Sequence, residues 1–127
     1  MIDALFSHPT YLATKKMLDA TVLRHEAIAS NLANIETPNY RRLDLAPDFN
    51  QQLQQAMSAG IPAQVGQLHP KLAVDSSAHA NGRDGNTVQL ESELVQLSQN
   101  TVAHALETQL VSSHLSRLRM AVTGKSI

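Results

Sequence analysis

The side chains best suited to chemistry in this 127-residue chain are its six histidines, namely His8, His25, His69, His79, His104 and His114. A helical metal site needs two histidines four residues apart, or a carboxylate set beside them in a ligand motif. The sequence has neither arrangement. His25 and His104 instead fall on predicted helix seams, where a polar residue more often packs or sets the register of pairing. We therefore predict no metal site and no cofactor.

Nucleophilic and phosphate chemistry also lack their usual patterns, although Ser, His and Asp are plentiful. The sequence has no nucleophile elbow and no glycine-rich phosphate loop. The segment Asn81–Gly85 contains two glycines but lacks the strand and helix that flank a phosphate loop, so it predicts a plain turn. There is no cysteine, which excludes disulfides, thiolate metal sites and cysteine nucleophiles. With no convergent polar cluster to line a pocket, we predict no catalytic residue and no enzyme.

Charge and composition give no sign of a nucleic-acid or membrane partner. The formal net charge is −1, and the basic pairs Arg41-Arg42 and Arg117/Arg119 are short, so we interpret them as solvated or interface charges. The apolar content is aliphatic, which suits helix seams better than an aromatic core. The segment Met1–Pro9 lacks the regions of a Sec signal peptide, and no apolar run approaches the ~18 residues that span a bilayer. We expect neither a cleaved signal nor direct lipid binding.

The elements that carry these residues are predicted to be mainly helical, beginning with one helix from about Thr10 to Ile35. This stretch has no Gly or Pro, and its seam residues recur at spacings of three and four. The helix must end before Pro38, because a residue that precedes proline is pushed out of the α region. The following residues predict a turn in which Asn39 takes a positive φ. The seam includes Leu18, Val22 and Leu32, and the turn is formed by Thr37, Pro38, Asn39 and Tyr40.

A second and longer helix is predicted from Val88 to about Val122, ending near Gly124. One heptad seam runs along it without a break, with Thr101, His104 and Thr108 among its members, and is expected to pair with the first helix. This seam includes Leu90, Leu94, Leu97, Val111, Leu115 and Leu118. An opposite stripe is expected to meet other chains, and it comprises Val88, Val95, Val102, Leu106 and Leu110. Two opposed stripes favour multi-chain packing over a compact homodimeric bundle, although the inward and outward faces are interchangeable on this argument.

The segment between the two long helices is predicted to be mostly irregular. Pro47–Ala59 has apolar residues on one helical face and Gly60 as a stop signal, so we predict one short helix there. Ile61–Asn86 is rich in Pro, Asn and Gly and predicts loops or a small hairpin. The fold class is therefore mainly α, with long terminal helices paired as an antiparallel, coiled-coil-like unit.

Ser30–Tyr40 resembles the N-terminal signature of the axial rod and hook proteins of the bacterial flagellum. That signature places two asparagines three residues apart and follows them with a Thr-Pro-Gly-Tyr-like turn. The chain has Asn31 and Asn34 at these positions and Asn39 in place of the usual Gly, which Asn can replace at positive φ. Its continuation from Arg41, and the segments Gly85–Leu94 and Leu118–Gly124, are also similar to this family, and most of all to its proximal rod members.

The resemblance implies a structural subunit rather than an enzyme. The two terminal helices, residues 1–37 and 88–127, would form one inner, D0-like domain joined by an irregular segment, residues 38–87. Copies would stack helically into a hollow drive shaft in the periplasm, after export without a cleaved signal peptide. The amides of Asn31 and Asn34 would then bond neighbouring chains, or Asn34 would cap its own helix.

The implied partners are the chain itself, rod proteins of the FlgC, FlgF and FlgG types, the membrane-ring adaptor FliE and the flagellar type III export apparatus. Phe49 and Leu53 also resemble a short hydrophobic export motif of related substrates, although one helix face explains the same spacing. Two other assignments remain open at this point. One is another axial rod protein of the same family, and the other is a helical-bundle secretion chaperone or regulator.

Overall fold

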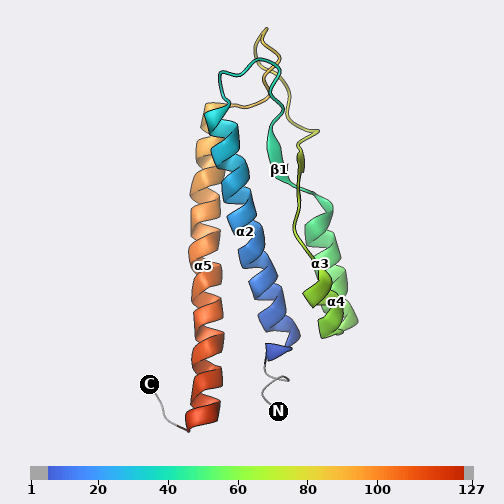
Figure 1. Ribbon diagram of the computed structural model, residues 1–127, viewed down its shortest axis with the longest axis vertical. Helices are drawn as coiled ribbons and strands as arrows, with labels where there is room; N and C mark the ends of the chain where they lie inside the picture. The colour runs from blue at the N-terminus through green and yellow to red at the C-terminus, as the bar shows by residue number, and fades with distance from the viewer. Residues whose placement is uncertain (1–5, 125–127) are drawn as a thin grey trace.

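Two long antiparallel helices form the spine of the computed structural model, which describes residues 6–124 (Figure 1). They are α2, Pro9–Ala33, and α5, Leu90–Thr123. Against α2 lie two short strands and two short helices, β1 (Leu43–Leu45), α3 (Asp48–Ala59), α4 (Pro62–Gln67) and β2 (Leu72–Val74). The predicted mainly α fold with paired terminal helices is confirmed. Residues 1–5 and 125–127, the outer ends of the first and last predicted segments, lie outside the described residues.

The helix boundaries follow local signals in the sequence. Pro9 occupies the first turn of α2, where its missing N–H costs nothing, and the His8 side chain accepts a hydrogen bond from the Thr10 N–H at 3.3 Å. Helix α3 ends at Gly60 and α5 ends at Gly124, with φ values of 68° and 64°. These left-handed caps are conformations that glycine adopts without steric cost. The predicted short helix and both glycine stops are therefore confirmed.

The middle segment is more ordered than predicted. Strands β1 and β2 pair antiparallel, with Leu43 opposite Val74 and Leu45 opposite Leu72. They are joined through α3 and α4, so this small two-stranded sheet is not a local hairpin within Ile61–Asn86. Part of that stretch, Pro62–Gln67, is helix α4 rather than loop, because Pro62 begins the turn and Val65 is fully buried against its neighbours.

The main cluster of buried apolar residues lies between α2 and the two short helices, and Ala27 and Ile28 are buried elsewhere on α2. Small residues on α2, Ala13 and Ala20, allow α3 and α4 to approach closely. The other members of this core are Phe49, Leu53, Ala56 and Val65. Phe49 and Leu53 share one buried face of α3, as the helix-face interpretation of their spacing predicted. On α5, by contrast, the buried residues are polar.

Candidate assembly surfaces and the buried polar seam

The turn after α2 has the conformation that the sequence predicted. Asn39 has a φ of 58°, and the Tyr40 N–H donates to the Thr37 carbonyl oxygen at 3.3 Å. The Asn39 N–H donates to the carbonyl oxygen of Asp84 at 2.8 Å, which ties the turn to the loop before α5. Gly85 in that loop has a φ of 73°, and a Cβ added there would lie 2.5 Å from Asn39 Oδ1. Only glycine therefore fits position 85 without a rearrangement.

Asn86 closes the C-terminal end of α2 from across the molecule. Its Nδ2 lies within hydrogen-bond distance of the carbonyl oxygens of Asn34 at 2.9 Å, Ile35 at 3.0 Å and Thr37 at 2.8 Å. Its Oδ1 accepts a hydrogen bond from the Val88 N–H at 2.8 Å. The Asn34 and Thr37 carbonyl oxygens also accept backbone N–H groups of the turn, so the Asn86 amide adds a link across the molecule to carbonyls at and just beyond the helix end. One side chain thus fastens the end of α2 to the start of α5.

The two signature asparagines act within the chain. Asn31 is fully buried, donates to the Leu43 carbonyl oxygen at 2.9 Å and accepts from the Leu43 N–H at 2.9 Å, so its amide serves as one more strand residue beside β1. Asn34 donates to the Ser30 carbonyl oxygen at 2.9 Å and accepts from the Thr37 hydroxyl at 3.2 Å. The expectation that Asn31 bonds a neighbouring chain is therefore corrected, and Asn34 has the local capping role that was the alternative.

A buried ion-pair network centred on Arg42 joins β1 to α5 and to the loop after β2. The Arg42 guanidinium contacts Glu93 through Nε at 2.5 Å, and Asp44 and Asp75 through Nη1 at 2.9 and 2.8 Å. Glu93 is fully buried and also accepts from Asn31 Nδ2 at 3.2 Å. The interpretation of Arg42 as a solvated or interface charge is therefore wrong. The carboxylates gather around it because a buried charge is stable only when it is paired.

The network changes the proton affinity of its members. Burial of Arg42 disfavours its charge, but hydrogen bonds to Asp44 and Glu93 outweigh that effect and raise the pKa of the guanidinium. Burial alone would raise the pKa of Asp44, but the hydrogen bond from Arg42 and the nearby charge of Arg24 bring it below its usual value. The pKa of Asp75 is lowered first by the Ser77 hydroxyl and then by Arg42. Arg42, Asp44 and Asp75 are therefore charged at neutral pH.

The contact between α2 and α5 is a polar seam, formed by Glu93, Asn100 and Glu107 at every seventh position of α5. The Thr21 hydroxyl donates to Glu107 Oε2 at 3.0 Å and lies 3.3 Å from His104 Nδ1. Asn100 Nδ2 donates to the Thr21 carbonyl oxygen at 2.8 Å. Burial raises the pKa of Glu107, although the Thr21 hydrogen bond and the charges of His104 and Arg24 oppose that shift.

The polar seam lies about 60° around α5 from the predicted leucine seam, at ~100° per residue. Four of the predicted seam residues are exposed, namely Val22, Leu90, Leu94 and Leu115. Their assignment to the contact within the chain is therefore corrected. It leaves five half-buried: Leu18, Leu32, Leu97, Val111 and Leu118. On α5 the leucines and the polar residues both recur every seven residues. The polar residues are the ones that face α2, because they form hydrogen bonds to it.

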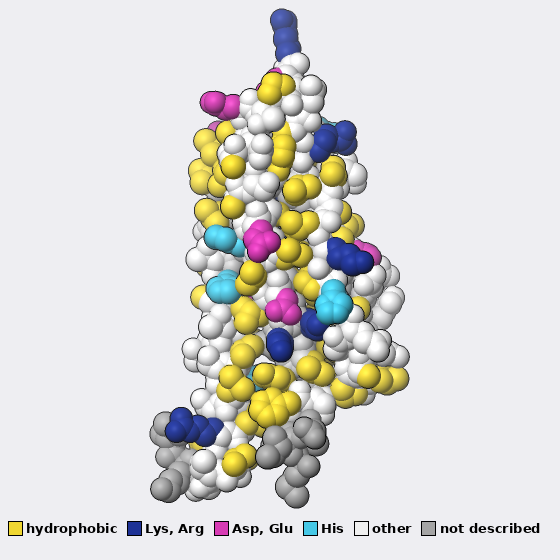
Figure 2. Space-filling view, viewed as in Figure 1, with side chains coloured by type: hydrophobic (Ala, Val, Ile, Leu, Met, Phe, Trp, Pro, Cys, Tyr) yellow, Lys and Arg dark blue, Asp and Glu magenta, His cyan; other side chains and the backbone are white. Residues whose placement is uncertain are grey.

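The opposite stripe of α5 is free of intramolecular cover over most of its length. Val95, Val102, Leu106 and Leu110 are 55%, 67%, 60% and 43% exposed. Val88, which was predicted in the same stripe, is instead buried beside Asn86 and Thr87, just before α5 begins. Hydrophobic side chains are visible along the length of the helix pair (Figure 2). An exposed apolar surface of this length is typical of a protein–protein contact.

Among the described residues, no cluster of three or more His, Asp or Glu side chains is placed to hold a metal ion. Within the same range, none of the helices is both long and apolar enough to span a membrane. The polar residues that the sequence analysis missed are Arg42, Asp44, Asn86, Glu93, Asn100 and Glu107. The signal that was available for three of them is the seven-residue recurrence of Glu93, Asn100 and Glu107 on one predicted helix.

Comparison with known proteins gives several relatives that share one name, whereas no family model matches the chain. A protein of Cereibacter sphaeroides is 29% identical over 115 residues, covering 80% of this chain and 84% of the relative. Proteins of Salmonella typhimurium and Aquifex aeolicus are 26% and 27% identical, covering 87% and 88% of this chain and 90% and 91% of the relatives. All three carry the name flagellar basal body rod protein FlgB. This chain is a homologue of these FlgB proteins over most of its length, and their name supports a structural role in the rod of the flagellar basal body.

Proposed function

We propose that the chain is a subunit of the proximal rod, assembling helically with other rod proteins into a hollow shaft that transmits torque and lets export substrates pass. The observation that carries this proposal is the stripe Val95, Val102, Leu106 and Leu110, which stays exposed on a helix whose intramolecular seam is polar. Burying one such side chain is worth about 1.5–3 kcal/mol. The stripe stays exposed when the single chain folds, so the free energy of burying it becomes available only on contact with neighbouring subunits.

The domain division and the location belong to the same proposal. Residues 1–37 and 88–127 form the inner domain, and residues 38–87 connect its halves while packing on α2. The subunit acts in the periplasm, after export through the flagellar type III apparatus without a cleaved signal. Burial of Phe49 and Leu53 in the core means that an export motif at these positions is accessible only in the unfolded chain.

The proposed partners are other copies of the chain, rod proteins of the FlgC, FlgF and FlgG types, and the adaptor FliE, with no role for nucleic acid or lipid. Catalysis has no part in the proposal, because the buried polar groups Arg42, Glu93 and Asn31 are engaged with one another and with the backbone. A different axial rod protein, or a helical secretion chaperone or regulator, is the alternative.

The test is a charge placed in the exposed stripe. Leu106→Asp should prevent incorporation into basal bodies isolated from cells that carry it as the only copy, because a carboxylate would be buried unpaired at each contact. The matched control is Ser112→Asp, the same charge at an exposed position about 120° around α5 from Leu106. Circular dichroism should show the same helix content for both variants. Normal incorporation of the Leu106→Asp chain would refute the assignment of this stripe to subunit contacts.

A further inference from the structure

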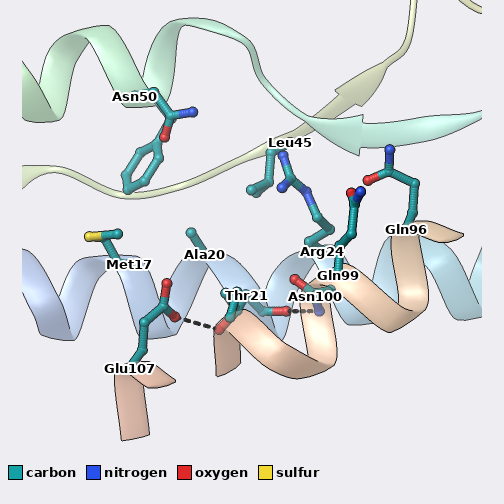
Figure 3. Close-up of a pocket in the computed structure, with 12 residues that line it drawn as sticks. Met17, Ala20, Thr21, Arg24, Leu45, Asn50, Gln96, Gln99, Asn100 and Glu107 are labelled. Atoms are coloured by element: carbon teal, nitrogen blue, oxygen red, sulfur yellow. Dashed lines mark hydrogen bonds between the residues drawn. The ribbon is translucent and has the colours of Figure 1, made fainter. Parts of the chain in front are cut away.

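A cavity of about 250 Å³ lies where α5, α2, α3 and β1 meet (Figure 3). Its floor is formed by Ala20 and Thr21 of α2, and Asn50 of α3 lies across it. On the α5 side its lining includes Gln99 and Glu107. The volume is enough for several waters or one long side chain, since a water occupies roughly 30 Å³ of liquid.

Hydrogen-bond acceptors without a matching donor distinguish this cavity. Asn100 is only 4% exposed, and its Oδ1 is a buried acceptor without a hydrogen-bond partner among the described residues. Its amide nitrogen is already engaged with the Thr21 carbonyl oxygen. Glu107 is 6% exposed and uses Oε2 to accept from Thr21. Arg24, the cation in the lining, donates to Asp44 at 3.0 Å.

The electrostatics also favour an incoming positive charge. Burial raises the pKa of Glu107 even with Thr21, His104 and Arg24 nearby, so the ionised carboxylate is incompletely compensated. A further cation would offset that cost, because an opposite charge stabilises a buried carboxylate. A guanidinium offers five donors and so is able to bond the carboxylate and the free amide oxygen together.

The cavity adjoins the exposed stripe on α5. Its lining residues Gln99 and Ala103 lie next to Val102 and Leu106 on the surface of the same helix, at ~100° per residue. Arg117 is exposed, continues the line of Leu106 toward the end of α5, and forms no ion pair among residues 6–124. It is roughly 15 Å along the helix from Glu107 of its own chain, which is beyond the reach of its side chain. If Arg117 fills this cavity, it must therefore come from another copy.

We propose that the cavity binds the guanidinium of Arg117 from a second copy of this chain, held by Asn100 Oδ1 and the Glu107 carboxylate. The proposal rests on the proposed function, because it requires the stripe to meet another subunit. The cavity and Arg117 lie at different places on each chain. A contact that joins the cavity of one copy to Arg117 of the next is therefore head-to-tail. Repetition of a head-to-tail contact gives a ring or an open helix rather than a closed dimer.

Crosslinking between copies tests the contact directly. The chain has no cysteine, so Gln99→Cys at the rim and Ser113→Cys one turn before Arg117 supply unique thiols. The two singly substituted full-length chains are mixed at high concentration, one carrying a mass tag, and treated with a short bismaleimide. The mixed product can form only between copies and should be a major species. Absence of the mixed product would overturn the proposal.

Charge variants identify the groups involved. Arg117→Glu in the Ser113→Cys chain should lower the mixed product at least about tenfold, whereas Arg119→Glu, an equal charge change on another face, should not. Glu107→Gln in the Gln99→Cys chain keeps an acceptor for Thr21 and should lower the yield severalfold. Equal yields for the two arginine variants, or no effect of Glu107→Gln, would overturn the proposal.

The Leu106→Asp variant separates this inference from the proposed function. If Leu106→Asp blocks incorporation into basal bodies while Arg117→Glu has no effect on crosslinking, the stripe meets another subunit and the cavity does not bind the arginine. If Leu106→Asp has no effect on incorporation or crosslinking, the proposed function itself fails at this surface.

Discussion

Loss of the Arg42 guanidinium should be among the most damaging single changes available in this chain. Arg42→Gln would leave the fully buried Glu93 carboxylate without its cation, with Asp44 and Asp75 close by. Removing one partner of a buried ion pair costs about 3–5 kcal/mol. With a urea m-value of about 2 kcal/mol/M, the midpoint of unfolding should fall by roughly 2 M.

Urea unfolding of the full chain, followed by circular dichroism, measures this loss. The matched control is Arg41→Gln, since Arg41 is the exposed neighbour and its removal changes the net charge equally. We expect the control midpoint to stay close to that of the parent chain, because exposed ion pairs are worth only about 0–1 kcal/mol. Equal midpoints for the two variants would refute the argument that the Arg42 network stabilises the fold.

The same network fixes how stability depends on acid. The folded-state pKa values of Asp44 and Asp75 are lowered, so these carboxyls contribute stability above their ordinary pKa of about 3.9, and that stability is lost as pH falls through the folded values. The Arg42→Gln variant should lose much of this acid dependence. An unchanged slope of stability against pH below pH 4 would contradict the cause assigned to the lowered pKa values.

Two further predictions concern single positions. Glu107→Gln should stabilise the chain at pH 8, because the raised pKa of Glu107 makes its ionised form costly in the folded state; the gain should shrink as pH falls toward the ordinary value of 4.5, and urea midpoints across this range measure it. A destabilised variant at pH 8 would contradict this reasoning. Gly85→Ala should cost about 1–3 kcal/mol from its positive φ, with added strain against Asn39 Oδ1, whereas Asn39→Gly should be tolerated. Equal thermal midpoints for these two variants would show that position 85 does not require glycine.

The sequence was sufficient to predict α2, α3 and α5, because helix signals are local, whereas the six-residue helix α4 was predicted as loop. Pro9, Gly60 and Gly124 mark boundaries by their own backbone preferences, and the positive φ of Asn39 follows from the turn that Pro38 begins. The phase of the helix contact was not predictable in this way. Leucines and polar residues recur with the same period on α5. Deciding which set faces α2 requires knowing which hydrogen-bonding groups α2 places opposite them.

The ion-pair network was missed for a related reason. Arg42 and Glu93 lie far apart in the sequence, and only the packing of both β1 and α5 against α2 brings them together. Asn31 likewise looked like a surface amide because its partner, the backbone of Leu43, belongs to a three-residue strand with little pattern of its own. Pairings set by tertiary structure leave no mark on local spacing.

The polar character of the seam between α2 and α5 has a consequence for temperature. Hydrophobic association weakens on cooling, because its driving force near room temperature is entropic. The hydrogen bonds of Thr21 with Asn100 and Glu107 do not depend on that driving force. The subunit contacts that we propose through Val102 and Leu106 would depend on it. In the proposed assembly, cooling should therefore weaken the contacts between subunits before it weakens the helix pair inside each one.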